Sequence, residues 1–305
     1  MKIRFLITII IFSSILYLWQ GIYLSKDSAG KKEIFGVEKG QNLYQIAENL
    51  EKEGLIKNKI FFEFYIFIKG NSKKLQAGEY SLSTSMNIPE IAQKIISGDI
   101  VKIRVTIPEG FTVKQIEEKL NLKLPGENLE GFLFPDTYYF PIEISGEEVV
   151  KIMKENFDKK IASLKEEIEN QGKTIFEIVT MASLVEKEVY NTQECPDCKN
   201  LVSGILWKRL KIGMPLQIDA TISYITGKKT TEISINETKI DSPYNTYKYR
   251  GLPVGPICNP GLESIIAAVY PKDSQYWYYL STPKGKTIFS KTLEEHNIAK
   301  AKYLK

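Results

Sequence analysis

A run of twenty residues without a charged side chain, Phe5 to Leu24, constrains this chain more than any other feature. A helix needs about 20 apolar residues to cross the hydrocarbon core of a bilayer, so the run suits one membrane-spanning helix. Lys2 and Arg4 precede it, and basic residues mark the cytoplasmic side of a span. We therefore expect a single-pass anchor in the cytoplasmic (inner) membrane, with the body of the protein outside the cytoplasm.

A cleaved signal peptide is the alternative interpretation of this run. Its apolar core would usually be shorter and would end at small residues. Here the run ends in Leu-Trp-Gln-Gly-Ile-Tyr-Leu, which lacks an Ala-x-Ala-like site and places aromatic residues at interface depth. The sequence therefore favours an uncleaved anchor, although Lys26, Lys31 and Lys32 on the far side weaken the charge bias.

The remaining sequence has the composition of an ordinary globular protein. Hydrophobic residues make up 43% of the 305 positions and charged residues 26%, enough for a sizeable core and two domains. The net charge of +4 is too small to indicate a nucleic-acid partner. We predict an α+β protein with a cytoplasmic tail (1–4), a transmembrane anchor (5–24), a linker (25–32), a small α+β domain (33–123) and a larger mixed α+β domain (124–305).

Residue periodicity supports regular structure in the smaller domain. Apolar residues at i, i+3, i+4 and i+7 predict an amphipathic helix over residues 43–50. Asn58 is placed to cap a second, aromatic-rich helix that Gly70 ends. Residues 101–107 alternate strictly between apolar and polar side chains, which predicts a strand.

In the larger domain the segment Met181-Ala-Ser-Leu-Val-Glu-Lys-Glu188 is the most informative. It lies in a stretch from Lys173 to Glu194 without Gly or Pro, which we interpret as helix. At 3.6 residues per turn, Glu188 shares a face with Met181, Leu184 and Val185. Glu is almost never buried unless it is paired or functional. Desolvation there would raise its pKa toward neutrality and make Glu188 a candidate proton donor.

Glu186 is the competing candidate on the same helix. Its face carries Val179, Ala182 and Ser183, which are smaller and more polar. A solvated Glu-Lys-Glu helix end is the alternative to both assignments, and the pattern by itself favours that alternative.

The cysteines and the single histidine do not indicate a metal site. One Cys-x-x-Cys pair, Cys195 and Cys198, without a second ligand pair is a weak metal signal, and Cys258 stands alone. Outside the membrane a disulfide is allowed, so the pair is either a local disulfide or two plain thiols. His296 cannot form a metal site by itself, and we expect it to be structural. We predict neither a metal nor a cofactor.

Two further segments carry aromatic side chains beside polar ones. Residues 130–141 place five aromatics around a Pro-Asp turn. Such faces pack against pyranose rings, but they also build ordinary cores, and the pattern favours a core. Residues 242–261 contain four Pro and three Gly, and a loop this long is uncommon unless it is functional or disordered. Its aromatic and amide side chains argue against disorder.

Five stretches of the sequence form a recognisable set: Met181–Glu188, Arg209-Leu-Lys-Ile-Gly-Met-Pro-Leu-Gln-Ile-Asp219, Ser242-Pro-Tyr-Asn-Thr-Tyr247 with Gly251-Leu-Pro253, Phe289-Ser-Lys-Thr292 with His296, and Glu130-Gly-Phe-Leu-Phe-Pro-Asp-Thr137. Together they resemble the endolytic murein transglycosylases, the YceG-like or MltG family, over nearly the whole chain. Residues 37–47 also resemble a LysM-like module, a type that binds glycan strands. A small spacer domain that binds nothing would show the same periodicity.

The resemblance implies a membrane-anchored lytic transglycosylase, a carbon–oxygen lyase that acts on a polysaccharide. Members of this family cleave nascent peptidoglycan between N-acetylmuramic acid and N-acetylglucosamine, leave a 1,6-anhydro end and so terminate strand elongation. It implies peptidoglycan strands, the membrane and penicillin-binding synthases as partners. The second Glu of the family's Glu-x-Glu motif is the catalytic acid, which falls on Glu188. We expect polar residues of the matching stretches to bind substrate: Glu186, Gln217, Asp219, Thr221, Tyr244, Asn245, Thr246, Tyr247, Glu130 and Asp136.

The sequence departs from the family pattern at Lys208, where Asn is usual, at Ala220, where Pro is usual, and near Thr287, where a His often precedes the Phe-Ser pair. These departures affect individual binding contacts rather than the reaction. Two alternatives remain open. One is a membrane-tethered peptidoglycan-binding scaffold without activity, which recruits synthases. The other is a hydrolase in which Asp219 or Asp136 serves as the base beside Glu188.

Overall fold

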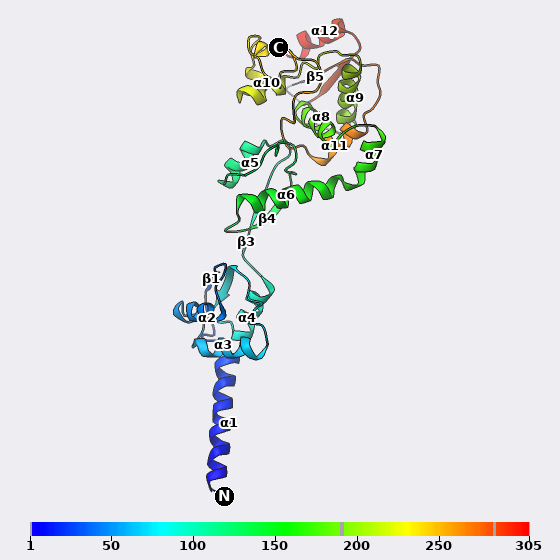
Figure 1. The fold of residues 1–305 in the computed structure, drawn as a ribbon. Coiled ribbons are helices and arrows are strands. Elements are labelled where there is room, and N and C mark those ends of the chain that lie inside the picture. Colours follow the sequence, from blue (N-terminus) through cyan, green and yellow to red (C-terminus); the bar gives the residue numbers. More distant parts are fainter. Residues whose placement is uncertain (1, 190–191, 283–284, 305) are drawn as a thin grey trace. The chain divides into compact units, whose positions relative to one another are not determined.

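The computed structural model describes residues 2–189, 192–282 and 285–304 and divides into two compact units (Figure 1). The N-terminal unit contains Met1–Val105 with Tyr139–Ile144, and the C-terminal unit contains Thr106–Tyr138 with Ser145–Lys305. Residues 106–123, which the sequence placed in the smaller domain, therefore group with the larger one. The mixed α+β character predicted from the sequence is present in both units.

The N-terminal unit begins with the long helix α1 (Lys2–Tyr23). Residues Ile3–Tyr23 are long and apolar enough to cross a membrane, with a mean hydropathy of 2.0, and they form the one such helix in the described part of the chain. A helix of this kind near the N-terminus is weak support for an anchor, because a signal sequence has the same properties.

The small domain after α1 is built on a two-stranded antiparallel sheet, β1 (Lys32–Val37) with β2 (Gly78–Ser83). Phe35 pairs with Tyr80 in the sheet, and both side chains are fully buried. Helices α2 (Leu43–Lys52), α3 (Lys59–Ile68) and α4 (Ile88–Ser97) pack around it. The predicted helix over residues 43–50 and the Asn58 cap are both present. The LysM-like character of this domain stays a prediction.

Strand β3 (Lys102–Thr106) confirms the strand expected at residues 101–107, and it pairs with β4 (Thr137–Pro141). The aromatic segment around β4 forms core, as its pattern favoured: Phe134, Tyr138 and Phe140 are buried.

The C-terminal unit is mainly helical. Its helices and short helical turns are α5 (Val113–Leu120), α6 (Gly146–Ile161), Ala162–Leu164, α7 (Lys165–Asn170), α8 (Ile175–Glu188), α9 (Cys198–Lys211), α10 (Asp219–Thr226), Thr230–Glu232, Glu237–Lys239, α11 (Leu262–Val269) and α12 (Leu293–Tyr303). Strands β5 (Tyr278–Ser281) and β6 (Thr287–Ser290) pair antiparallel.

Helix α8 is the centre of this unit, and its core-facing neighbours are α9 and α11 (Figure 1). Thr174 and Glu177 form a capping box at its start. The helix ends at Glu188, earlier than the uninterrupted stretch suggested, because Val189 is already extended. Every residue from Ile178 to Glu186 is buried, so α8 is enclosed on all sides rather than along one stripe.

Candidate functional site

The last turn of α8 presents two glutamates to different surroundings. Glu186 and Glu188 are two positions apart, which places them on opposite sides of a helix. Glu188 is partly exposed at the helix end, whereas only 4% of Glu186 is exposed. Their roles are therefore separable from geometry alone.

The Glu188 carboxyl lies where α8, α9, α10 and the β5 strand meet. It is hydrogen-bonded by the Tyr279 hydroxyl and by the backbone N–H of Ala220, in the first turn of α10. Desolvation raises the pKa of Glu188 to about 7. The hydrogen bond from Tyr279 opposes that rise, the negative charge of Asp219 adds to it, and the Arg209 charge and the Ala220 hydrogen bond oppose it more weakly. A carboxyl of this kind can hold a proton near neutral pH and release it to a neighbour.

Arg209 supports this corner through the hydrogen bonds of its guanidinium. It is buried, and its Nε and Nη2 donate to the Trp277 carbonyl at 2.9 and 2.7 Å. Its Nη1 donates to the Leu216 carbonyl at 2.8 Å. These bonds fix the chain before β5 and the turn before α10, the two segments that carry the partners of Glu188.

The turn before α10 is fastened to the long loop 242–261 by buried hydroxyls. Thr246 Oγ1 accepts a hydrogen bond from Ile218 N at 2.9 Å and lies 3.2 Å from Thr221 Oγ1. Asn245 is also buried, and its Nδ2 donates to the carbonyls of Thr238 and Ile240. Thr221, Asn245 and Thr246 were expected to bind substrate. Thr246 and Thr221 join the loop to α10, whereas the Asn245 amide joins it to residues 238–240. Their roles in substrate binding stay predictions.

Two other predicted residues near the start of α10, Gln217 and Asp219, are exposed. Asp219 accepts a hydrogen bond from the Tyr247 hydroxyl, with 2.5 Å between the oxygens. The side chain of Gln217 is exposed, and its φ of 54° is in the left-handed region that non-glycine residues rarely adopt. Strained backbone of this kind clusters at functional sites. Asp219 is close enough to Glu188 for its charge to raise the pKa of that acid. The binding roles of Gln217, Asp219 and Tyr247 stay predictions.

Glu186 makes interior contacts. Its Oε2 accepts hydrogen bonds from Gly261 N at 3.0 Å and from Ser264 Oγ at 2.6 Å, and it lies 3.5 Å from Lys199 Nζ. The Lys199 side chain is itself only 3% exposed. Glu186 thus joins α8 to the start of α11 and to α9, and it does not share the surroundings of Glu188.

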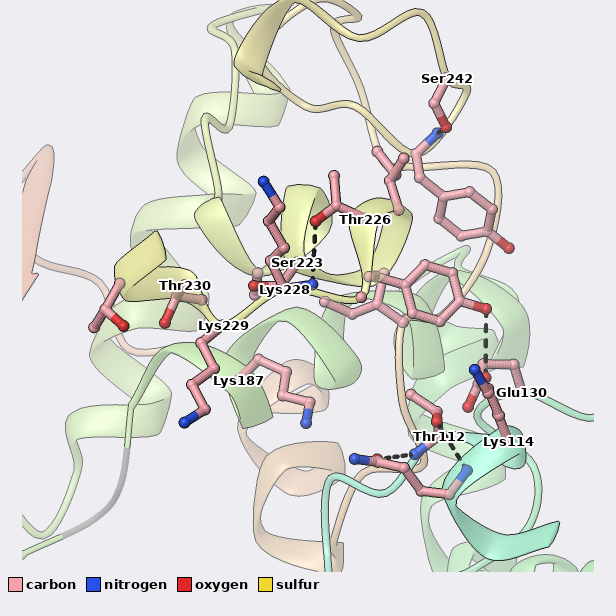
Figure 2. Close-up of a pocket in the computed structure, with 18 of the residues that line it drawn as sticks. Thr112, Lys114, Glu130, Lys187, Ser223, Thr226, Lys228, Lys229, Thr230 and Ser242 are labelled. Atoms are coloured by element: carbon pink, nitrogen blue, oxygen red, sulfur yellow. Dashed lines mark hydrogen bonds between the residues drawn. The ribbon is translucent and has the colours of Figure 1, made fainter. Parts of the chain in front are cut away.

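A cavity of about 1240 Å³ opens beside α10 (Figure 2). Its lining includes Glu130, Lys187, Ala220, Tyr224 and Tyr244. Ala220 also donates its backbone N–H to Glu188, so the cavity borders the acid's surroundings. Tyr224 and Tyr244 form an aromatic pair with ring centroids 4.9 Å apart. The volume is large enough for several sugar rings.

Glu130 is a second unusual acid on the cavity wall. It accepts hydrogen bonds from Val113 N at 3.1 Å, Asn259 Nδ2 at 3.2 Å and the Tyr224 hydroxyl at 3.3 Å. Burial raises its pKa to about 7, although the Val113 and Tyr224 hydrogen bonds oppose the rise. Asp136 contacts α6 instead. Its carboxylate accepts a hydrogen bond from Asn156 Nδ2 at 3.2 Å and forms an ion pair with Lys160 Nζ, also at 3.2 Å.

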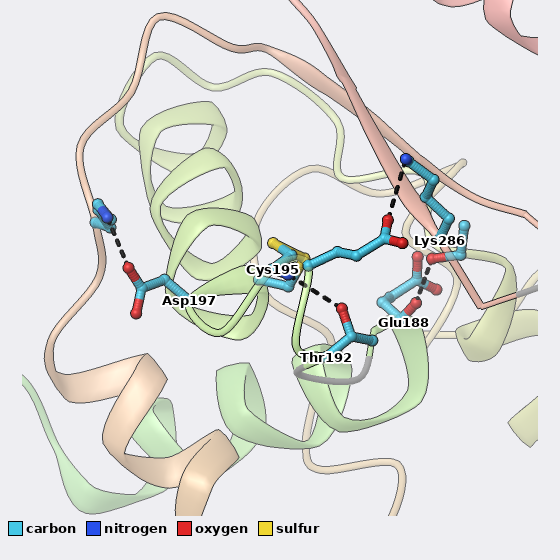
Figure 3. Close-up of a disulfide and its surroundings, with 9 residues drawn as sticks. Glu188, Thr192, Cys195, Asp197 and Lys286 are labelled. Carbon is cyan, nitrogen blue, oxygen red and sulfur yellow. Dashed lines mark hydrogen bonds and ion pairs between the residues drawn. A yellow bond between two sulfur atoms is a disulfide. The ribbon is translucent and has the colours of Figure 1, made fainter.

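The segment after α8 contains a disulfide between Cys195 and Cys198 (Figure 3). This resolves the alternative between a disulfide and two thiols. Two ion pairs tie the segment to its surroundings, Glu194 with Lys286 at 3.1 Å and Asp197 with Lys272 at 2.7 Å. Cys258 is a buried free thiol, and His296 stacks on Tyr278. Within the described residues, no group of three or more His, Cys, Asp or Glu side chains is arranged to hold a metal ion.

Sequence reasoning missed Tyr279 and the backbone N–H of Ala220, the two donors to Glu188. A backbone donor has no sequence signal except its place in the first turn of a helix, where N–H groups are free.

The chain is similar to proteins of one family. The profile of the YceG-like family matches residues 35–302. An endolytic murein transglycosylase of Bacillus subtilis (strain 168) is 33% identical, covering 92% of this chain and 87% of that protein. An endolytic murein transglycosylase of Streptococcus pneumoniae serotype 2 (strain D39) is 31% identical, covering 89% of this chain and 58% of that longer protein. The crystal structure of a YceG-like protein from Listeria monocytogenes superposes with a TM-score of 0.58 at 32% identity, covering 89% of this chain and all of that one.

Proposed function

This chain belongs to the YceG-like family, and from that premise we propose that it is a membrane-anchored peptidoglycan lytic transglycosylase in which Glu188 is the only carboxyl that transfers protons. Its relatives are named endolytic murein transglycosylases, so the substrate class is the glycan strand of peptidoglycan. The bond cleaved joins N-acetylmuramic acid to N-acetylglucosamine within a nascent strand. The product ends in 1,6-anhydro-N-acetylmuramic acid, and cleavage terminates elongation of that strand.

The observation that carries this proposal is the environment of Glu188. With a pKa of about 7, the carboxyl is protonated in a large share of molecules at neutral pH. Neutral Glu188 donates its proton to the glycosidic oxygen as the bond to the muramic acid C1 breaks. The carboxylate then removes the proton of the C6 hydroxyl of the same sugar, and O6 bonds to C1. The leaving sugar keeps the first proton, Glu188 ends protonated, and no water is consumed.

This route needs one acid because the nucleophile belongs to the substrate. Intramolecular attack benefits from a high effective molarity once the sugar is held in a suitable conformation. The developing positive charge at C1 is stabilised by the Asp219 carboxylate beside the acid, which the Tyr247 hydroxyl orients. Gln217 is exposed at the same place and can contact the substrate's polar groups. We assign Asn245 to holding the loop, because its amide nitrogen donates to the carbonyls of Thr238 and Ile240.

The large cavity is the place for the neighbouring sugars of the strand. Tyr224 and Tyr244 offer aromatic surface to pyranose rings, and Lys114, Lys187, Lys228 and Lys229 line the wall. Ammonium groups suit the carboxylates of peptide-substituted strands. Helix α1 is the membrane anchor, with the body outside the cytoplasm where peptidoglycan lies, and partners from the penicillin-binding synthases fit that placement.

The decisive test compares Glu188→Gln with the wild-type protein on peptidoglycan strands. We expect the variant to fold normally and to form no 1,6-anhydro ends by mass spectrometry, because Gln keeps the shape of the side chain but cannot give up a proton. Glu130→Gln is the matched control: it changes an acid of similar pKa on the cavity wall, and it should keep the reaction type. Full activity of Glu188→Gln would overturn the assignment. If the wild-type protein produces reducing ends without the anhydro ring, it is a hydrolase. If it does not cleave the strands at all, it is a membrane-tethered binding protein.

A further inference from the structure

Helix α3 has two apolar faces. Within the described residues, one face is buried in the protein core and the other is exposed. Phe61, Phe62 and Ile66 are buried in the core of the N-terminal unit. On the other side the exposed side chains are, with their exposed fractions, Ile60 (58%), Phe64 (39%), Phe67 (74%) and Ile68 (62%). Their spacing of i, i+4, i+7 and i+8 places them on one face of the helix. Four large apolar residues on one exposed face mark a surface that another apolar phase covers.

The start of α3 packs directly against the end of α1, within the same unit. The rings of Tyr17 and Phe61 are 5.4 Å apart in an edge-to-face arrangement. A Cβ added to Gly21 would lie 2.5 Å from the Phe61 ring, so the two helices are in close contact there. Ile22 is buried in the same core.

The length of α1 then sets the depth of α3. At about 1.5 Å per residue, the candidate span Ile3–Tyr23 is just long enough for a hydrocarbon core of about 30 Å. The part of α1 that precedes Tyr17 would be only about 21 Å long, too short to span. The residues of α1 that contact α3 must therefore lie within the membrane or its interface. The stacked pair Trp19 and Tyr23 fits that depth, because Trp and Tyr gather at the membrane interface.

We propose that α3 is an interfacial helix whose outer face, Ile60, Phe64, Phe67 and Ile68, is buried in the outer leaflet of the membrane. The occupant of this face is lipid, because α3 joins α1 at membrane depth. Lysines at positions 57, 69, 73 and 74 flank the helix and Lys59 is its first residue, with Glu63 as the only acidic residue from 57 to 74. Apolar aromatics with flanking lysines match helices that lie in the boundary between headgroups and acyl chains.

This inference rests on α1 being the span proposed above, and it goes beyond anchoring. A helix that only crosses the membrane lets the domain behind it rotate and tilt away from the bilayer. A second helix embedded in the leaflet fixes the N-terminal unit on the membrane surface. The lipid-facing side of that unit is then closed to glycan, which leaves its other surfaces for any ligand.

The test uses the full-length protein in lipid vesicles with an environment-sensitive fluorophore on a single introduced cysteine. Ile68→Cys places the label on the outer face of α3. Ile34→Cys is the matched control, because Ile34 is an isoleucine of similar exposure (57%) on β1, which lies at the far side of the unit from α1 in Figure 1. Ile10→Cys, inside α1, reports on the span itself. Quenching by iodide in water and by nitroxide-bearing lipids is measured for each label, and circular dichroism checks each fold.

We expect the label at position 68 to be several-fold less quenched by iodide than the label at 34, and to be quenched by the nitroxide lipids. Equal iodide access at 68 and 34, with position 10 quenched by lipid, would overturn the interfacial helix and leave the anchor intact. Protection from iodide without lipid quenching at 68 would show that protein covers the face, which also overturns the proposal. A label at 10 that lipid nitroxides do not reach would overturn the anchor and the interfacial helix together. Activity on soluble strands is a separate readout of the Glu188 chemistry.

Discussion

Glu186 and Glu188 show how strongly a carboxyl's role depends on what surrounds it. Glu186 accepts hydrogen bonds from Gly261 and Ser264 deep in the unit, whereas Glu188 meets Tyr279 and Ala220 at the end of the helix. The sequence singled out Glu188 through its apolar neighbours, and in the structure the charge of Asp219 acts on this carboxyl. The two donors that tune its pKa come from segments about 30 and 90 positions away in the chain, which no local pattern can reveal.

The pKa of Glu188 leads to a prediction for the pH dependence of catalysis. The free enzyme must carry the proton that it donates, so kcat/KM should fall as the pH rises through about 7, by about tenfold per unit well above that value. Initial rates of anhydro-product formation between pH 5 and 9 measure this decrease, the alkaline limb of the pH profile. A rate that is constant up to pH 9 would contradict the role of Glu188 as the acid.

Replacing Tyr279 by Phe should change the pH at which kcat/KM begins to fall. The Tyr279 hydrogen bond opposes the rise in the pKa of Glu188, so its removal should raise that pKa and shift the alkaline limb to higher pH. Tyr278→Phe is the matched control, because this neighbour stacks on His296 instead. A Tyr279→Phe variant that loses rate equally at every pH would indicate a purely structural role.

At the scale of the element, α8 shows what periodicity can and cannot predict. The absence of Gly and Pro correctly indicated a helix, but its end at Glu188 and its burial on every side were not foreseen. A helix enclosed by α9, α10 and α11 has no solvent face, so the periodicity of its apolar residues says little about which side is buried.

The loop 242–261 is the reverse case. Its composition correctly marked it as unusual, but the structure shows that Asn245 and Thr246 use their polar groups inside the protein.

Helix α8 depends on Glu186 for its attachment to α11. We expect Glu186→Ala to lower the free energy of unfolding by about 3 kcal/mol, because it leaves the buried Gly261 N–H, the Ser264 hydroxyl and the Lys199 charge without this acceptor. Glu186→Gln keeps an acceptor and should cost less. Urea unfolding measures both. A loss of activity in Glu186→Gln at unchanged stability would instead assign Glu186 to the chemistry.

At the scale of the whole molecule, the sequence predicted an apolar N-terminal helix followed by two α+β regions, and the structure has both. Two segments group differently from the expected domains: residues 106–123 belong to the C-terminal unit, and residues 139–144 belong to the N-terminal unit. Residues 106–123 carry α5, and the N-terminal end of that helix provides Val113 N to Glu130 in the C-terminal unit. A boundary drawn at Pro and Gly residues cannot register such long-range contacts.

The anchor can be tested on the whole chain by removing residues 1–16. This deletion keeps Tyr17, Gly21 and Ile22, which pack on the N-terminal unit, but removes most of the apolar length. We expect the full chain to float with vesicles after alkaline carbonate treatment and the shortened chain to be extracted. Both should cleave soluble strands equally, because Glu188 lies in the other unit. Retention of the shortened chain in carbonate would contradict α1 as the sole span.

One hairpin holds the acid at two points. The Ser281 hydroxyl donates to the main-chain carbonyl of Glu188 at 2.8 Å, and Tyr279, two residues earlier on the same strand, bonds to the carboxyl. Because both bonds come from the same short strand, we expect a displacement of β5 to shift the backbone and the carboxyl of Glu188 together. The distance between the acid and its Tyr279 donor should then change little.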